Sequence, residues 1–194
     1  MNKSDKHLIS KNVSNGPTFT LSNRLSRFFW NIAWFLFARF TPNFMHKYRI
    51  ALINLFGGNV HRTSVVYPTV KIWAPWNLEI GKYSTLGPNV NCYNLGKVII
   101  GDSSIVSQNV TLCTATHDYD DEAFKMILGK IEIGNNAWIC DSSYLMPNVI
   151  ISEGVIIGAN STAVKQDYRR WSVYAGNPTV LIKNRKEIRL KFNR

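Results

Sequence analysis

The chain has 194 residues, a formal net charge of +11 and a hydrophobic content of 45%. This length suits one domain with appendages, and the apolar content is ordinary for a globular protein. Residues 1–60 carry eight Lys or Arg against one acid, residues 61–164 carry six against nine, and residues 165–194 carry nine against two. Basic ends around a slightly acidic middle predict anionic partners, either membrane phospholipid or cofactor phosphates. The chain has no nucleic-acid-binding motif, so nucleic acid is not expected as a partner.

The three cysteines, Cys92, Cys113 and Cys140, argue against a disulfide framework. Their number is odd and they fall at compact packing positions, which predicts buried free thiols in a reducing compartment. The first twenty residues contain no apolar run followed by a small-residue cleavage site, as a secretory signal would. We therefore expect a cytoplasmic protein.

Residues 1–20 are rich in Lys, Ser and Asn, and we expect a flexible arm there. A helical segment is predicted over 21–57, with Ser22 as the first N-cap and Pro42 ending the first helix. A second helix is expected from His46 to Phe56. The apolar stretch of the first helix is about a dozen residues, short of the roughly 20 that span a bilayer.

Two compatible interpretations of this aromatic, basic segment remain open. Its helices could cap the open end of the following domain and cover backbone and apolar side chains that would otherwise meet water. They could also lie on a membrane surface, since Arg24, Arg27, Arg39, Lys47 and Arg49 accompany the aromatic residues.

An aliphatic or alanine residue recurs at every sixth position between 131 and 164: Ile133, Ile139, Leu145, Ile151, Ile157 and Ala163. A helix would repeat apolar residues at intervals of three and four, and a half-buried strand at two. A period of six is typical of the hexapeptide parallel β-helix, in which three short strands form one triangular coil. We expect each aliphatic residue to point inward and the small residue after it to fit the tight turn.

The same phase extends backwards in three shorter runs: Ile100, Val106 and Leu112; Ile80, Leu86 and Cys92; Val60, Val66 and Ile72. The spacing slips by two between successive runs, which predicts small turn insertions. The interval from Leu112 to Ile133 exceeds a coil of eighteen residues by three. We therefore predict a mainly β fold, with a β-helix over 58–167 and an excursion loop over 113–131.

A basic extension is predicted over 168–194. It begins with an apolar strand from Ser172 to Ala175, which Gly176-Asn177-Pro178 ends. The tail from Val180 to Arg194 follows, with a short helix considered over 186–192.

Only two of the four histidines, His61 and His117, lie in the repeat region. The zinc site of β-helix carbonic anhydrases needs three, so no metal is expected. His117 stands at the start of the excursion loop, where a neutral imidazole could take a proton from an attacking hydroxyl. From position alone, a structural histidine bonded to a nearby carbonyl is the favoured interpretation.

Several strings resemble the hexapeptide-repeat acetyltransferases, in particular those of colanic acid and related exopolysaccharide synthesis, and more distantly the maltose and galactoside O-acetyltransferases. The similarity covers about 21–185 and rests on Val90-Asn91-Cys92-Tyr93-Asn94, Ser107 to Thr114, His117-Asp118-Tyr119, Ala137-Trp138-Ile139 and Ala175-Gly176-Asn177-Pro178.

The resemblance implies a left-handed parallel β-helix, a homotrimer, and acetyl-CoA bound between subunits. It makes His117 the general base of a direct transfer and the backbone N–H of Asp141 the oxyanion donor. Tyr93, Asn94, Asp118 and Trp138 would contact the acceptor. Residues at the cofactor positions of the family are Asp141, Ala159, Val164, Lys165, Val180 and Lys183.

We therefore expect an O-acetyltransferase that uses acetyl-CoA and acts on a sugar or saccharide intermediate of surface polysaccharide synthesis. The enzyme would be cytoplasmic, with peripheral contact to the inner face of the membrane left open. Two alternatives remain: N-acetylation of an amino sugar, which the same histidine would serve, and a non-catalytic β-helix scaffold that binds through its basic ends.

Overall fold

The computed structural model describes residues 19–188. The arm expected over 1–20 lies outside this range, except for its last two residues, as does the end of the basic tail. Two helices come first, α1 (Leu21–Phe37) and α2 (His46–Leu55). The N-cap of α1 is Thr20, whose side chain accepts a hydrogen bond from Asn23 N, so the expected cap at Ser22 is wrong by two residues. The helix also ends earlier than predicted, since a turn occupies the residues between Phe37 and Pro42.

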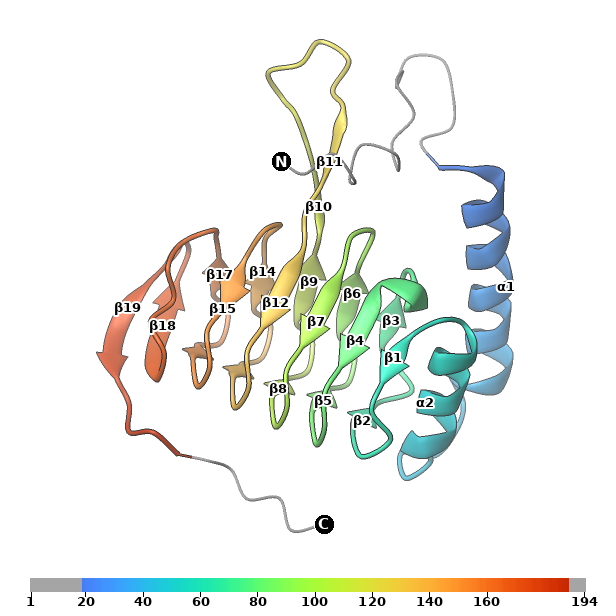
Figure 1. Ribbon diagram of the computed structural model, residues 1–194, viewed down its shortest axis with the longest axis horizontal. Helices are drawn as coiled ribbons and strands as arrows, with labels where there is room; N and C mark the ends of the chain where they lie inside the picture. The colour runs from blue at the N-terminus through green and yellow to red at the C-terminus, as the bar shows by residue number, and fades with distance from the viewer. Residues whose placement is uncertain (1–18, 189–194) are drawn as a thin grey trace.

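The chain then winds into a triangular prism of three parallel sheets, which confirms the predicted parallel β-helix (Figure 1). Sheet A contains β1 (Asn59–Val60), β4 (Leu78–Ile80), β7 (Val98–Ile100), β12 (Ile131–Ile133) and β15 (Ile150–Ile151). Sheet B contains β2 (Val65–Val66), β5 (Thr85–Leu86), β8 (Ile105–Val106), β13 (Trp138–Ile139) and β16 (Ile156–Ile157). Sheet C contains β3 (Lys71–Ile72), β6 (Asn91–Tyr93), β9 (Thr111–Cys113), β14 (Tyr144–Leu145) and β17 (Thr162–Ala163).

The residues of the sixfold pattern fill the centre of this prism. Every one of them is buried, from Val60 in the first coil to Ala163 in the last complete one. Neighbouring coils align these positions directly, as in the pairs Ile100 with Ile133 and Leu112 with Leu145. Burial of one aliphatic side chain contributes about 1.5–3 kcal/mol, so the repeat itself is the main source of stability.

The small residue that follows the inward position is required by the neighbouring coil. A Cβ built on Gly134 would lie 2.7 Å from Glu153 N, and one on Gly101 would lie 2.8 Å from Asn135 N. Positive φ angles occur instead at non-glycine corner residues such as Asn89, Asn109 and Ser142. The prediction of a small residue is therefore explained by stacking between coils more than by backbone conformation within one turn.

Serine side chains satisfy the backbone inside the corners between sheets A and B. Ser84 Oγ donates to Gly101 O at 2.6 Å and accepts from Ser104 N at 2.9 Å. Ser104 Oγ repeats the arrangement one coil further on, with Gly134 O at 2.7 Å and Ala137 N at 3.1 Å. Such a ladder pairs buried polar groups that would otherwise be costly.

The first predicted insertion contains a short 3₁₀ turn, η2 (Pro75–Asn77), after β3. Asn94 stands in the equivalent insertion of the next coil and is completely buried. Its Oδ1 accepts from Trp73 N and Ala74 N at 3.1 and 3.0 Å, and its Nδ2 donates to Ala74 O at 2.6 Å. This side chain therefore holds two adjacent insertions together.

The excursion is a β-hairpin that leaves the prism at the corner between sheets C and A. It consists of β10 (Ala115–His117) and β11 (Met126–Leu128), paired antiparallel, and it projects well away from the coils (Figure 1). At its base, Thr114 Oγ1 accepts from Gly96 N at 2.9 Å and donates to Tyr93 O at 3.1 Å. The base of the hairpin is therefore held to this corner by hydrogen bonds.

The C-terminal segment forms two further strands on sheet B. β18 (Ser172–Gly176) extends the parallel ladder beside β16, and β19 (Thr179–Asn184) returns antiparallel to it. The residues from Val180 to Asn184, predicted only as part of a basic tail, are strand, because their apolar and β-branched side chains follow the turn at Gly176-Asn177-Pro178. No helix occurs over 185–188, and the rest of the considered helix lies outside the described residues.

α1 and α2 cover the first coil, with the side of α1 that carries its two tryptophans packed inward. Trp30 is buried and its Nε1 donates to Ile72 O at 2.7 Å, while Trp34 packs beside it with ring centroids 5.1 Å apart. The opposite side of α1 leaves a stripe of large apolar residues exposed: Leu21, Leu25, Phe28, Phe29, Ile32, Phe35 and Leu36. Among the described residues, no helix is long and apolar enough to cross a membrane.

Candidate active site

His117 is the last residue of β10, where it pairs in register with Met126 of β11. Its Nδ1 lies 2.9 Å from the carbonyl oxygen of Phe124. A carbonyl oxygen can only accept, so Nδ1 carries the proton of the neutral imidazole and Nε2 keeps its lone pair. The phenyl ring of Phe124 stacks on the imidazole, with centroids 4.5 Å apart and planes inclined by 10°. Both contacts fix the ring and leave the lone pair of Nε2 free of these contacts.

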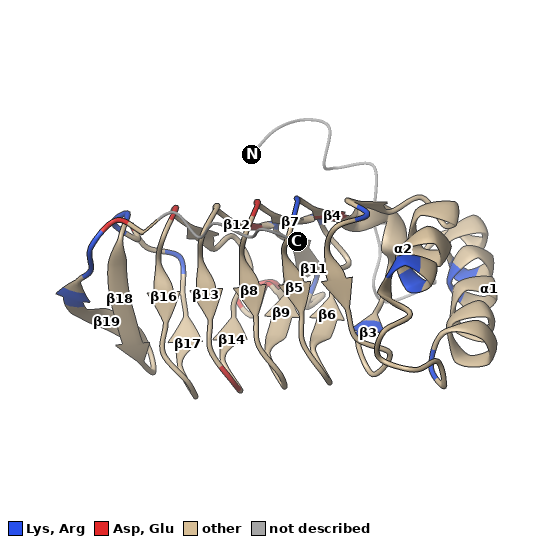
Figure 2. Ribbon diagram, turned by 90° about the horizontal axis from the view of Figure 1, so that it is seen from below, with Lys and Arg blue, Asp and Glu red and all other residues tan. Residues whose placement is uncertain are grey.

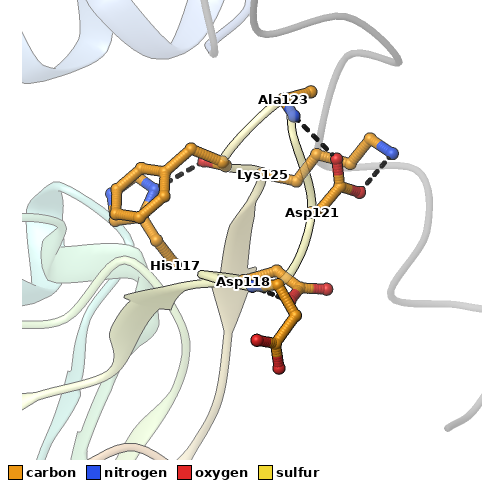
Figure 3. A network of polar contacts seen from close by, with 7 residues as sticks. His117, Asp118, Asp121, Ala123 and Lys125 are labelled. Carbon is orange, nitrogen blue, oxygen red and sulfur yellow. Dashed lines mark hydrogen bonds and ion pairs between the residues drawn. The ribbon is translucent and has the colours of Figure 1, made fainter.

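The tip of the hairpin is closed by acidic residues and one lysine (Figure 3). Asp121 accepts from Lys125 Nζ at 2.5 Å and from Ala123 N at 2.9 Å. The hydrogen bond from Lys125 lowers the pKa of the Asp121 carboxyl, and the same bond raises the pKa of Lys125. Asp118 N donates to Lys125 O at 2.8 Å, and its carboxylate accepts from Asp120 N at 3.2 Å. These contacts hold the loop that carries Phe124.

A second set of groups lies at the corner between sheets B and C, far around the coil from the hairpin. Asp141 and Ala159 stand there in successive coils, each just before a residue with positive φ, Ser142 and Asn160. Among the described residues neither the N–H of Asp141 nor that of Ala159 has a hydrogen-bond partner. In an earlier coil the equivalent turn has Pro88 before Asn89, and proline has no N–H to satisfy. The later coils thus present free backbone donors at this edge.

The side chain of Asp141 belongs to the same edge. Its Oδ1 accepts from Asn109 Nδ2 at 3.0 Å, and Asn109 Oδ1 accepts from Asn89 Nδ2 at 3.3 Å. This row of amides and one carboxylate runs along the B–C corner and stabilises the turns that present the N–H groups. The carboxylate is thus engaged in the coil, so the group of Asp141 that is available to a ligand is its backbone N–H.

Trp138 lies on the outer surface of sheet B and is 45% exposed. Its Nε1 donates to Ser107 Oγ at 2.9 Å, which holds the indole against the preceding coil. The ring offers an exposed aromatic wall in the coil that also carries Asp141.

The remaining expected cofactor residues are exposed or half-exposed near the end of the prism. Val164 and Lys165 follow β17, at the corner between sheets C and A, while Val180 and Lys183 lie on β19. Arg185, the next cation, places its guanidinium 5.3 Å from the centroid of the Trp171 ring. Figure 2 shows the resulting distribution, with Lys and Arg gathered at the α1–α2 end and at β19.

The expected acceptor residues separate into two groups. Tyr93 is 36% exposed on sheet C and faces Trp73 at a centroid distance of 6.2 Å, and Asp118 lies at the end of the hairpin strand. Asn94, in contrast, is fully buried with its side chain engaged by backbone, so we do not retain it as an acceptor residue.

Sequence reasoning missed Phe124 and Ser107, which position His117 and Trp138. Phe124 adopts a φ of 46°, and nothing in the sequence of the loop indicates that a phenylalanine takes this conformation there. Ser107 stands in a string that resembles the family, and the string does not indicate its contact with Trp138. Among the described residues, no group of three or more His, Cys, Asp or Glu side chains is placed to hold a metal ion.

Comparison with known proteins adds to this geometry. The family description "Bacterial transferase hexapeptide (six repeats)" matches residues 130–163. An Escherichia coli (strain K12) protein named "Putative colanic acid biosynthesis acetyltransferase WcaF" is 35% identical over 158 residues, which are 81% of this chain and 86% of that protein.

Two solved structures share the fold. A maltose O-acetyltransferase from Clostridium difficile 630 superposes with a TM-score of 0.75 at 23% identity, covering 87% of this chain and 90% of its own. A galactoside acetyltransferase in complex with coenzyme A superposes with a TM-score of 0.72 at 26% identity, covering 85% and 83%.

Proposed function

This chain belongs to the hexapeptide-repeat acetyltransferases, and we propose that it moves an acetyl group from acetyl-CoA to a hydroxyl of a sugar or saccharide intermediate in surface polysaccharide synthesis. The identity to the colanic acid protein supports the pathway class. The single observation that carries the chemistry is the contact of His117 Nδ1 with Phe124 O, because it leaves Nε2 free to accept a proton.

The residues would act in one step without an acyl-enzyme. Acetyl-CoA supplies the activated acetyl carbonyl. Nε2 of His117 accepts the proton of the acceptor hydroxyl as its oxygen attacks, and later returns that proton to the leaving sulfur. The N–H of Asp141 donates to the oxygen on which negative charge develops, and one such donor typically contributes a factor of ~10²–10³ to the rate.

The residues present fit the donor substrate. The unpaired N–H of Ala159 lies one coil beyond that of Asp141 on the same edge, and this backbone donor suits an amide carbonyl of a pantetheine arm. Lys165 and Lys183 are exposed cations toward the end of the prism and suit phosphate groups. Val164 and Val180 would line the groove beside them.

The placement of these groups supports a homotrimer, which we propose as the assembly. His117 leaves the prism at the corner between sheets C and A, whereas Asp141 lies at the corner between sheets B and C. We infer from these two corners that the groups meet between chains, since a neighbour rotated about a threefold axis can face the hairpin of one chain with the B–C corner of the next. We therefore assign each active site to two subunits.

We place the enzyme in the cytoplasm, at the inner face of the membrane. The exposed apolar stripe of α1 and the neighbouring Arg24, Arg39 and Lys47 support contact with an anionic bilayer. Flotation with vesicles containing anionic phospholipid tests this, with Phe28→Ser/Phe29→Ser as the variant. Wild-type protein that stays in the soluble fraction would contradict membrane contact.

The catalytic proposal is tested by thiol release from acetyl-CoA over a panel of hydroxyl sugars and amino sugars. His117→Ala is compared with wild type, and His61→Ala serves as the control because that residue bonds only within the first coils. Activity on hydroxyl sugars that His117→Ala loses and His61→Ala keeps is the expected result. Activity confined to amino sugars would overturn O-acetylation, and equal turnover of His117→Ala and wild type would remove His117 from the reaction.

A further inference from the structure

A groove of about 460 Å³ separates α1 from sheet C. Trp30, Trp34 and Phe35 line it from the helix. Lys71, Trp73 and Tyr93 line it from the sheet. Its size falls within the range of small-molecule sites, and its walls are largely aromatic. We call it the helix groove.

The helix groove carries positive charge without acidic partners. Arg39 and Lys71 line it, both are exposed, and neither forms an ion pair or a side-chain hydrogen bond among the described residues. Arg27 stands over Trp73, with its guanidinium 4.0 Å from the ring centroid. The sequence has no Asp or Glu between Asp5 and Glu79, so nothing nearby in the chain neutralises these cations. Unpaired cations around an aromatic groove favour a phosphorylated ligand.

One side of the groove is continuous with the exposed stripe of α1. Phe35 lines the groove and is also a member of that stripe, which extends from Leu21 to Leu36 along the outer side of the helix. A ligand with a long apolar chain could therefore leave the groove along the stripe while its polar end stays between Arg39 and Lys71. A soluble nucleotide has no apolar chain, so the stripe would add nothing to its binding affinity.

The other side of the groove leads to the catalytic hairpin of the same chain. Tyr93 pairs in register with Cys113 on the adjacent strand, and its carbonyl accepts from Thr114 Oγ1. Thr114 directly precedes β10, which ends at His117. The sheet side of the groove thus lies beside the corner from which His117 is presented.

From this juxtaposition we propose that the acceptor is a saccharide carried on a lipid phosphate or diphosphate, with its phosphate held in the helix groove. The proposal rests on the proposed function and narrows its acceptor to a lipid-linked class. The apolar chain lies on the stripe of α1, the phosphate meets Arg39 and Lys71, and the sugar extends past Tyr93 toward His117. A nucleotide sugar offers the same phosphates but no chain for the stripe, so it serves as the competing ligand.

Binding, measured apart from acetyl transfer, tests the groove. Farnesyl diphosphate, inorganic diphosphate and uridine diphosphate are titrated against tryptophan fluorescence, since Trp30, Trp34 and Trp73 line the groove. Farnesyl diphosphate is expected to bind at least about tenfold tighter than either of the others, because its chain buries apolar surface. Arg39→Gln and Lys71→Gln should each weaken it about fivefold. Lys82→Gln, an exposed cation at the A–B corner of the second coil, is the charge-matched control and should change nothing.

Equal affinity for uridine diphosphate and farnesyl diphosphate would overturn the lipid-linked class, and unchanged binding in the Arg39→Gln/Lys71→Gln double variant would overturn the site. If a second copy of the chain covers the groove, farnesyl diphosphate leaves the tryptophan fluorescence unchanged. The Arg39→Gln/Lys71→Gln variant then changes the sedimenting mass of the protein, and this result also overturns the proposed site. Failure of the proposed function has a different signature, in which farnesyl diphosphate binds as expected while no sugar is acetylated.

Discussion

The imidazole of His117 lies flat against the phenyl ring of Phe124, and its Nδ1 is 2.9 Å from the carbonyl oxygen of that residue. One residue therefore controls both the tilt of the ring and its tautomer. The carbonyl holds the proton on Nδ1, and the phenyl ring limits rotation about the side-chain bonds. We regard Phe124 as a positioning residue for His117.

Replacing Phe124 with leucine should lower kcat about tenfold, because the stack that orients the imidazole is lost while the backbone carbonyl remains. KM for acetyl-CoA should not change, since the cofactor residues lie elsewhere. Phe124→Tyr keeps the stack and should restore the wild-type rate in steady-state kinetics. Tyr119→Leu, an 83% exposed residue of the same loop, is the control. A changed KM for acetyl-CoA with an unchanged kcat would contradict the positioning role.

The proposed oxyanion donor, the N–H of Asp141, can be removed without removing a side-chain function. Asp141 occupies the turn position that Pro88 fills in the second coil, so proline suits the backbone there. Asp141→Pro should lower kcat by roughly 10²–10³-fold, because the N–H is gone. Asp141→Ala loses only the contact with Asn109 and should stay within about fivefold of wild type.

Gln108→Pro places the same substitution one coil earlier and is the control for any effect of proline on the fold. Its far-ultraviolet circular dichroism and its rate should match those of wild type. A rate for Asp141→Pro equal to that of Asp141→Ala would exclude the N–H from the reaction.

Asn94 is predicted to matter for stability and not for acceptor binding. Asn94→Ala removes three hydrogen bonds to the backbone of Trp73 and Ala74. It leaves Ala74 N unpaired, while Trp73 N keeps its bond to Cys92 O and Ala74 O keeps its bond from Asn77 N. The free energy of unfolding should fall by about 2–4 kcal/mol, measured by urea denaturation. Asn59→Ala, an exposed asparagine of β1, should be neutral. An acceptor KM raised by Asn94→Ala at unchanged stability would reverse this assignment.

The three thiols should differ in reactivity toward iodoacetamide. Burial raises the pKa of Cys92 to about 12, so at pH 8 the folded protein holds almost no Cys92 thiolate, the reactive form. Burial also raises the pKa of Cys140, but that residue is only partly covered. Mass spectrometry should therefore find Cys140 labelled first and Cys92 labelled only after unfolding. Labelling of Cys92 before Cys140 in the folded protein would contradict the packing of the second coil.

The prism could be predicted because its signal is repeated. Each inward aliphatic position from Ile133 to Ala163 is supported by the next, and the phase persists through the shorter runs. Insertions interrupt this regular spacing. Asn94 lies where the spacing slips by two, so the pattern does not say whether its side chain points in or out. The structure resolves this through backbone contacts with the preceding coil, which lie twenty residues away along the chain.

The site could be predicted only in part, for a related reason. His117 stands out as a lone imidazole on an excursion loop, but Phe124 contacts it through a hairpin register that no periodicity encodes. The interpretation of His117 as bonded to a nearby carbonyl also holds, and the two roles are compatible because that bond uses Nδ1. The considered C-terminal helix was wrong at its start, since no helix occurs over 186–188, after β19 has ended at Asn184.

The central claim is that one subunit supplies His117 while its neighbour supplies the N–H of Asp141. The most direct measurement is acetyl transfer by trimers reassembled from equal amounts of the His117→Ala and Asp141→Pro chains, each inactive alone. Random assembly places an intact His117 opposite an intact Asp141 at about one interface in four, so about a quarter of the wild-type activity should return. Mixed trimers that stay as inactive as either parent would contradict the account.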